Sequence, residues 1–191
     1  NLPTDAKASL VSGLLNAGLI EVEVTSFVKK ERVPQLADAE ELLSLLPTKD
    51  KFRALTPNLR GLTRAHDAHL ATVALFTAVS ETFCLKNINS SIEDSFIRSE
   101  KTVAQAQEWG MEIYGYLSCC LGCSYEGAIA PDVVLGYALR LYRMGCSRII
   151  ISDTTGMGTP HLVTQLFSLL LEHIPTENLA VHFHGNPQQV V

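Results

Sequence analysis

The sequence predicts an α/β fold built around a parallel β-sheet, and two features support this prediction. Apolar runs of strand length alternate with longer segments of helical periodicity, giving one helix, five strand–helix pairs and a final strand. Helices between strands imply right-handed crossovers, which make consecutive strands parallel. Neither GxGxxG nor GxxxxGK[ST] is present, so a nucleotide-binding doubly wound sheet lacks its usual marker.

The spacing of the strands fits a (β/α)8 barrel of the TIM-barrel type better. A complete barrel needs about 250 residues, whereas this chain has 191. About six strands are visible, and the chain begins on a helix. We therefore expect an incomplete (β/α)8 barrel that forms a single catalytic domain over residues 1–191.

Capping and breaking residues bound the elements of the first half. Thr4-Asp5 is the predicted N-cap of the first helix, and Gly18 ends that helix. Pro47 closes the second helix. In chain order, the expected elements are a helix to Gly18, a strand over 19–24, a loop over 25–27, a helix over 38–46, a strand over 52–55 and a helix that starts at Pro57-Asn58.

The elements of the second half are bounded in the same way. Residues 71–78 are almost entirely apolar, as a strand buried on both faces requires. Pro131 opens a helix that Gly145 ends, and Pro175 breaks the last helix. The expected elements are a strand over 71–78, a polar loop over 80–91, a helix over 92–109, a strand over 112–118, a loop to 130, a helix over 131–144, a strand over 148–152, a helix over 160–174 and a strand over 179–184.

The last predicted strand ends in two histidines, His182 and His184. Because side chains alternate along a strand, both imidazoles lie on one face, while Val181 and Phe183 take the other. One interpretation is a pair of metal ligands at the tip of the strand. The other is two histidines that are capped by backbone groups or water. Neutral imidazoles with carboxylate or amide oxygens would suit Mg, Mn, Fe or Zn.

Polar residues also gather where the other predicted strands end, which is where TIM-barrel active sites lie. The set comprises Glu23, Ser26, Asn58, Asn87, Tyr116, Ser118, Asp153, Thr154, His182 and His184. Glu23 is the most informative member, because it stands between Val22 and Val24. It either points inward as a functional carboxylate or points outward on the same face as Glu21.

Composition excludes several kinds of partner and site. A net charge of −5 without basic clusters argues against nucleic acid. No apolar run is long enough to span a bilayer, and no signal peptide is visible, so no membrane partner is expected. The odd count of five cysteines favours free thiols in a reducing compartment. Cys120-x-x-Cys123 lacks the further ligands of a zinc site, so we expect a structural or incidental role rather than a metal or redox role.

Several segments, taken together, resemble the hydroxymethylglutaryl-CoA lyase family. They are Glu23-Val-Thr-Ser-Phe-Val28, Val33-Pro-Gln-Leu-Ala-Asp38, Leu55-Thr-Pro-Asn-Leu-Arg-Gly61, Ser80-Glu-Thr-Phe-Cys-Leu-Lys-Asn-Ile-Asn89, Gly115-Tyr-Leu-Ser-Cys119, Leu121-Gly-Cys-Ser-Tyr-Glu-Gly127, Asp153-Thr-Thr-Gly-Met-Gly-Thr-Pro160 and Ala180-Val-His-Phe-His184. The resemblance runs from about residue 4 to 184, which is nearly the whole chain.

The resemblance implies a TIM-barrel lyase that cleaves 3-hydroxy-3-methylglutaryl-CoA to acetyl-CoA and acetoacetate with Mg or Mn. By motif, His182 and His184 would ligate the metal, and His182, Glu23 and Asp153 would be catalytic. The substrate would be bound by Asn87, Tyr116, Ser26 and Thr154. A homodimer is one expected assembly. The compartment would be the cytoplasm in a bacterium, and the mitochondrial matrix or peroxisome in a eukaryote.

The sequence also departs from the family at both ends. The family's first strand, with its Arg-Asp pair, and its last two strands, with a catalytic Cys loop, have no counterpart, and Gly185-Asn-Pro-Gln-Gln-Val-Val191 does not match. The chain is expected to be either a fragment or a truncated isoform, with little or no lyase activity alone. Alternatives are a related barrel such as 2-isopropylmalate or homocitrate synthase, or a non-catalytic chain that binds acyl-CoA or full-length subunits.

Overall fold

The computed structural model describes residues 2–47 and 49–184, and the divergent tail over 185–191 lies outside the described residues. The helices are α1 (Thr4–Asn16), α2 (Ala39–Leu45), α3 (Leu59–Asp67), α4 (Glu81–Ile88), α5 (Ile92–Glu108), α6 (Pro131–Met144) and α7 (Pro160–Leu171), with short 3-10 turns η1 (Pro34–Leu36) and η2 (Thr176–Asn178). The strands are β1 (Val22–Ser26), β2 (Phe52–Leu55), β3 (Thr72–Ala78), β4 (Glu112–Ser118), β5 (Arg148–Asp153) and β6 (Leu179–Phe183).

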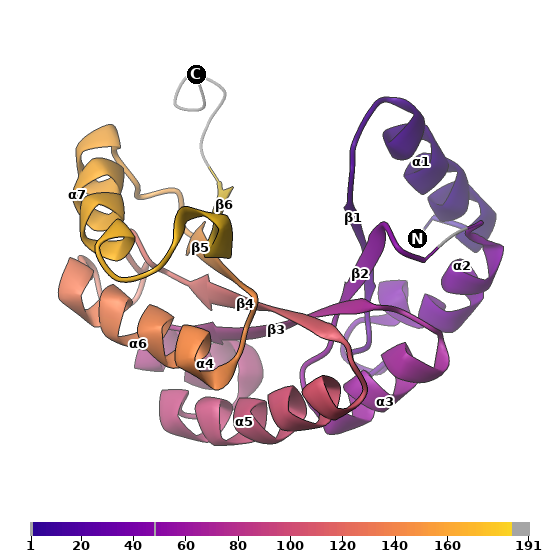
Figure 1. Cartoon of the computed structure of the whole chain (residues 1–191), viewed down its shortest axis with the longest axis horizontal. Coiled ribbons are helices and arrows are strands. Elements are labelled where there is room, and N and C mark those ends of the chain that lie inside the picture. The colour runs from indigo at the N-terminus through magenta and orange to yellow at the C-terminus, as the bar shows by residue number, and fades with distance from the viewer. Residues whose placement is uncertain (1, 48, 185–191) are drawn as a thin grey trace. The chain divides into compact units, whose positions relative to one another are not determined.

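The strands form one sheet in the order β1-β2-β3-β4-β5-β6, with helices in the connections (Figure 1). The pairs β1–β2, β2–β3, β4–β5 and β5–β6 are parallel, as predicted. The chain divides into two compact units, one of residues 1–75 and 101–113 and the other of residues 76–100 and 114–191. The prediction of a single catalytic domain stays a prediction.

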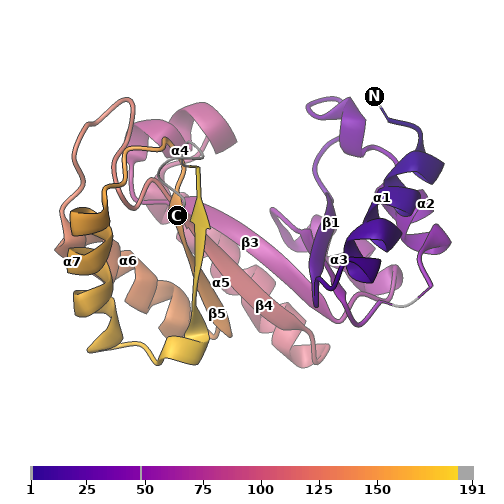
Figure 2. The same ribbon diagram turned by 90° about the horizontal axis from the view of Figure 1, so that it is seen from above.

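In the first unit, α1 packs against both α2 and β1 (Figure 2). Strand β2 shows which side faces the core, because Phe52 and Ala54 are buried while the alternating residues Arg53 and Leu55 are only half-buried. The apolar face of β2 therefore meets the helices, and the face that carries Arg53 is the helix-free face of this unit.

A bulge in β1 decides which of its residues share that helix-free face. Glu23 pairs with Arg53 and Ser26 pairs with Leu55, whereas Thr25 pairs with Ala54, so Val24 is the extra residue. Paired residues in parallel strands project to the same side. Glu23 and Ser26 therefore lie on one face, although they are three residues apart.

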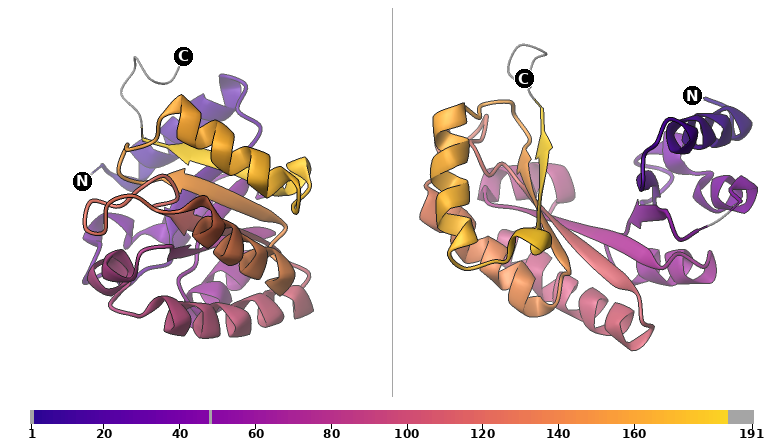
Figure 3. Two further views of the ribbon diagram at one scale, coloured as in Figure 1. Left: turned by 90° about the vertical axis from the view of Figure 1, so that its left-hand side faces the viewer. Right: turned by 45° about the horizontal axis from the view of Figure 1, so that its top comes forward.

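In the second unit, α6 packs against α7 and against β5, and Figure 3 shows these helices beside β5 and β6. The core of this unit includes Ile149, Ile151, Leu141, Leu166 and Leu170, all at or below 1% exposure. Within the described residues, no helix is both long and apolar enough to cross a membrane.

Most predicted elements are confirmed, several with bounds shifted by one residue, and four predictions are wrong. Strand β1 begins at Val22 rather than at 19 and continues to Ser26. Thr4 is the first residue of helix α1 rather than its N-cap, which is Pro3, and the Thr4 hydroxyl donates to Asp38. Helix α7 ends at Leu171, three residues before the predicted end.

The predicted loop over 80–91 is the fourth error, since it contains helix α4. Ser80 caps this helix by accepting from the Phe83 amide, and Glu126 accepts from the Thr82 amide at 2.7 Å. Asn89 ends the helix with a left-handed φ of 51°. Glu126 lies 44 positions from Thr82 and so leaves no local signal, whereas the N-cap Ser80 is a local signal that sequence reasoning missed.

Candidate metal and acyl-binding site

The two histidines predicted at the tip of β6 lie together in the structure. The Nε2 atoms of His182 and His184 are 2.7 Å apart, and the ring centroids are 4.8 Å apart. Such a distance suits either an N–H donating to the other ring's lone pair or two lone pairs directed at one cation. Both side chains are exposed, so a ligand can reach them.

The pair supplies only part of a metal site. Within the described ranges, no group of three or more His, Cys, Asp or Glu residues is placed to hold a metal ion. The two imidazoles fit a divalent cation as two of its ligands, and further ligands must come from elsewhere.

Tyr116 lies on the same face of the sheet as His182. The register aligns Tyr116 of β4 with Ile150 of β5, and Ser152 of β5 with His182 of β6, so the side chains share one side. The rings of Tyr116 and His182 meet edge to face, with centroids 5.9 Å apart. The structure thus brings two predicted site residues from different strands into contact.

Asp153 has a different position from the one its catalytic prediction suggests. It pairs with Phe183, on the face opposite His182, and is only 4% exposed. Its carboxylate accepts hydrogen bonds from the amides of Met157 (3.0 Å) and Gly158 (2.9 Å). Asp153 therefore holds the loop after β5 in place, and a catalytic role for it stays a prediction.

Thr154 and the loop after β5 are tied to the end of β4 and to β6. The Thr154 hydroxyl accepts from the amide of Cys119 at 2.9 Å. Gly156 has a φ of +66°, and a Cβ there would lie 2.5 Å from the carbonyl oxygen of His184. The loop over 153–158 therefore sits directly against the histidine tip.

Asn87, predicted in a loop, lies instead on the last turn of α4 and is exposed. Its substrate-binding role stays a prediction. Asn58, the other amide of the set, caps α3 by accepting from the amide of Gly61 at 3.0 Å.

Glu23 and Ser26 belong to the first unit and are described by its contacts alone. Arg53 bridges two carboxylates, with Nε 3.2 Å from Glu23 and Nη1 2.6 Å from Glu21. The two glutamates share a face, as the period of two predicts. Sequence reasoning missed Arg53, although a cation inside the apolar run of 52–55 was the available signal.

The hydroxyl of Ser26 has a feature that points to a ligand. It is 6% exposed, and its Oγ has no hydrogen-bond partner among the described residues; the same is true of Thr25 Oγ1. An unsatisfied buried hydroxyl costs about 1–3 kcal/mol. A substrate oxygen that reached Ser26 would remove this cost.

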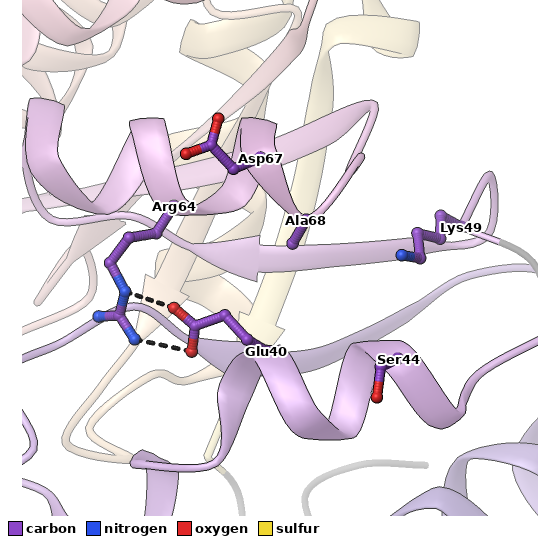
Figure 4. A pocket seen from close by; sticks show the side chains of 6 residues that line it. All are labelled: Glu40, Ser44, Lys49, Arg64, Asp67 and Ala68. Carbon is purple, nitrogen blue, oxygen red and sulfur yellow. Dashed lines mark hydrogen bonds and ion pairs between the residues drawn. The ribbon is translucent and has the colours of Figure 1, made fainter.

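A shallow hollow of about 440 Å³ also lies between α2 and α3 (Figure 4). Arg64 spans it and bonds Glu40 through two contacts of 2.6 and 2.9 Å. The hydrogen bond from Arg64 holds the pKa of Glu40 below its ordinary value. Its lining residues are Glu40, Ser44, Lys49, Arg64, Asp67 and Ala68, none of which is a predicted site residue.

The family model described as HMGL-like matches residues 1–189. The chain belongs to the HMGL-like family. The recognition from sequence segments is confirmed, and the loop and strand-tip residues described above are those of an HMGL-like chain.

This HMGL-like chain is similar to named lyases along its whole length. It is 42% identical over 192 residues to the mitochondrial hydroxymethylglutaryl-CoA lyase of Arabidopsis thaliana, covering 100% of this chain and 41% of that protein. It is 41% identical over 185 residues to the hydroxymethylglutaryl-CoA lyase of Pseudomonas mevalonii, covering 96% and 62%. The chain therefore spans only part of these relatives.

Solved structures confirm the fold class. The hydroxymethylglutaryl-CoA lyase of Pseudomonas aeruginosa superposes with a TM-score of 0.92 at 37% identity, covering 96% of this chain and 62% of that one. An HMG-CoA lyase from Acinetobacter baumannii, in complex with coenzyme A and 3-methylmalate, gives 0.91 at 31% identity, covering 96% and 60%. The HMGL-like chain is an incomplete TIM-type barrel of six parallel strands.

Proposed function

We propose that this chain is part of a hydroxymethylglutaryl-CoA lyase, which cleaves 3-hydroxy-3-methylglutaryl-CoA to acetyl-CoA and acetoacetate. The observation that carries the proposal is the convergence of His182 and His184 at 2.7 Å, at a strand tip of a chain matched throughout to proteins of that name. The complex of a similar lyase with coenzyme A and 3-methylmalate supports an acyl-CoA substrate that bears a hydroxyl and a carboxylate.

In this proposal His182 and His184 would hold Mg or Mn through Nε2. Such a cation supplies Lewis acidity to a hydroxyl or carbonyl oxygen. Loss of the tertiary hydroxyl proton would let the carbon–carbon bond break, giving the ketone of acetoacetate and an acetyl-CoA carbanion that takes up a proton. His182 is the proposed proton carrier, because a ring that ligates through one nitrogen keeps the other for proton exchange.

The remaining residues would bind and orient. The Ser26 hydroxyl, buried and unsatisfied, would meet a substrate oxygen, and Glu23 would be the carboxylate near the reacting proton. Tyr116 would fix the His182 ring through its edge contact. Asn87 and Thr154 are proposed to bind the acyl group, with Asp153 holding the loop that carries Thr154.

The compartment and assembly belong to the proposal as well. Similar lyases are named as mitochondrial and as cytoplasmic, and one comes from a bacterium. We propose a reducing compartment, consistent with five free thiols, and a homodimer as the assembly.

A second candidate function is a non-catalytic chain that binds acyl-CoA or associates with full-length subunits. It is favoured by the presence of only two candidate ligands in the described part of the chain, and by coverage of only 41–62% of the curated relatives.

Acetoacetate release from hydroxymethylglutaryl-CoA separates the two. We expect the 191-residue chain with Mn to release little or none, and a chain extended at both ends to release it in an EDTA-sensitive manner. His182→Ala should abolish release in the extended chain, whereas His173→Ala, in the turn after α7, should not. If the extended chain also released no acetoacetate, the non-catalytic function would be favoured. If the 191-residue chain released acetoacetate, the site would not need residues outside this chain.

A further inference from the structure

The loop after β4 holds two thiols that the proposed lyase reaction does not use. Cys119 and Cys123 are both buried, and the amide of Gly122 between them donates to the Cys119 carbonyl at 3.3 Å, which closes a turn. Cys123 Sγ also lies 3.0 Å from the Oγ of Ser80 and 3.4 Å from the amide of Tyr125. The two thiols therefore belong to one turn, and the sulfur of Cys123 has defined polar neighbours.

The surroundings make the two thiols chemically unequal. Burial opposes ionisation of Cys123, but hydrogen bonds from Ser80, from the amides of Tyr125 and Glu126 and from Cys119 outweigh it, so its pKa lies below the ordinary value. Burial raises the pKa of Cys119 to about 12, and the neighbouring Cys123 adds to that rise. A stabilised thiolate beside a protonated thiol is the arrangement of an attacking and a resolving cysteine.

The position of Cys123 relative to α4 contributes to this difference. Ser80 is the N-cap of α4, so Cys123 contacts the hydroxyl at the positive end of a helix. Helix N-termini favour thiolate over thiol. The Ser80 hydroxyl can donate to a thiolate while its oxygen still accepts from the Phe83 amide.

The backbone holds the two cysteines in one compact turn. Cys119 has a left-handed φ of 64°, which is uncommon for a residue with a side chain. Cys123 and Gly127 close the following turn with two backbone hydrogen bonds of 2.8 and 2.7 Å. Residues 124–127 of that turn are exposed, so Cys123 lies directly beneath a surface segment.

We propose that Cys119 and Cys123 form a reversible disulfide within this loop when the protein meets a hydroperoxide. The Cys123 thiolate attacks one peroxide oxygen, the O–O bond breaks, and the other oxygen leaves and is protonated to water. Cys119 then attacks the sulfenic sulfur, an S–S bond forms, and the S–O bond breaks to release the second oxygen as water. Hydrogen peroxide is reduced to two waters, and two thiols are oxidised to one disulfide.

Oxidation of this pair would change the position of the loop that carries the predicted substrate-binding residue Thr154. The Cys119 amide donates to Thr154, and the Thr155 hydroxyl donates to the carbonyl of Gly122 at 3.0 Å. Closing the disulfide pulls on residues 119–123, which these two bonds hold to the loop after β5. We therefore expect faster amide exchange over 154–158 in the oxidised protein.

The test uses the 191-residue chain, treated under native conditions with increasing hydrogen peroxide, then unfolded in urea, labelled with iodoacetamide and digested with trypsin, because all five thiols are buried in the folded protein. Cleavage after Lys101 and Arg140 gives one peptide that holds Cys119, Cys120 and Cys123. We expect this peptide to lose two of its three labels, with fragment ions placing the remaining label on Cys120. Dithiothreitol should restore all three, and the peptides of Cys84 and Cys146 should stay fully labelled.

Two variants give the order of attack. In Cys119→Ser, dimedone should trap a sulfenic acid at Cys123; in Cys123→Ser, no sulfenic acid should form at Cys119. The matched control Cys120→Ser should still form the disulfide. Retention of all three labels in the unmodified protein, or a disulfide that involves Cys84 or Cys120, would overturn the proposal. Because the readout is the mass of peptides, the result does not depend on lyase activity.

Discussion

At the scale of single residues, the carboxylate of Asp38 bonds to side chains of another helix instead of capping its own helix. It stands at the N-cap of α2, yet its side chain accepts from Thr4 at 2.9 Å and from Lys7 at 2.7 and 2.8 Å. Burial pushes its pKa upward, but the bonds from Lys7 and Thr4 outweigh this, so the pKa lies below the ordinary value. The pair joins α1 to the start of α2.

This link predicts a stability that depends on pH. A lowered carboxyl pKa contributes stability that is complete above the unfolded-state pKa and is lost as pH falls through the folded-state pKa. Asp38→Asn should lower the free energy of unfolding at pH 7 by about 0.5–1 kcal/mol, and by less in acid. Urea titrations at both pH values measure this, with the exposed Asp50→Asn as control. An equal loss at both pH values would rule out the charge as the cause.

Cys123 gives a second prediction at this scale. Its thiol should be alkylated by iodoacetamide at a lower pH than Cys119, which lies in the same loop and is equally buried, because its pKa is lowered and that of Cys119 is raised to about 12. Mass spectrometry of timed samples across a pH series measures both rates in one peptide. Equal pH profiles for the two thiols would contradict the assigned hydrogen bonding.

At the scale of elements, the contact between the loop after β5 and the end of β6 rests on Gly156. Gly156→Ala adds the strain of a positive φ and places Cβ 2.5 Å from the His184 carbonyl oxygen. Gly127→Ala is the matched control, because its φ of +74° carries the same strain and a Cβ there meets nothing within 4 Å. Strain alone costs about 1 kcal/mol, so we expect Gly127→Ala to lose about that and Gly156→Ala clearly more.

Thermal unfolding compares these two glycine variants, and amide exchange over residues 179–184 shows where the loss falls. Only Gly156→Ala should speed exchange there. If both variants behave alike, the loop does not press on the histidine tip.

The elements also show what the sequence could and could not predict. Helix α6, bounded by Pro131 and Gly145, was predicted to the residue, because its start and stop signals are local. Sequence reasoning misses helix α4, although Ser80 is a local N-cap signal, and its second cap, Glu126, lies in a distant loop. Hydrophobicity places Leu19 and Ile20 in β1, but both lie before the strand, and Ile20 is 86% exposed. An apolar run in the sequence does not distinguish exposed apolar residues from those of a buried strand.

The site residues were likewise predictable only where their positions follow from the local sequence. The shared face of His182 and His184 follows from the period of two, and the structure bears it out. The neighbour of His182, Tyr116, comes from another strand. The register between strands β4, β5 and β6, which brings the two rings together, cannot be predicted from the residues around either one. The backbone bonds of Asp153 likewise depend on the course of the loop over 154–158.

At the scale of the whole molecule, β6 is the last strand in the sheet order of the described residues, and it exposes apolar side chains. Val181 is 54% exposed and Phe183 is 41% exposed, on the face opposite His182. An edge strand with an uncovered apolar face favours pairing with another chain.

This surface predicts association that depends on protein concentration. Sedimentation velocity of the 191-residue chain should show larger species as concentration rises, and Val181→Lys should suppress them, because a charge on the edge opposes pairing. Leu85→Lys, on the exposed face of α4, is the control and should associate like the unmodified protein. A single monomeric species at all concentrations would contradict this role of β6.

The extra residue Val24 in β1 has a consequence of its own. It interrupts the alternation of side chains, so the residues before and after Val24 do not follow one continuous period of two. Removing Val24 would leave Glu23, Thr25 and Ser26 opposite Arg53, Ala54 and Leu55, so the strand would become regular and Ser26 would stay on the face of Glu23. If Val24 instead paired with Ala54 in a regular strand, Thr25 would lie opposite Leu55 and Ser26 would turn to the other face. The bulge therefore decides which of the two hydroxyls lies on the face of Glu23.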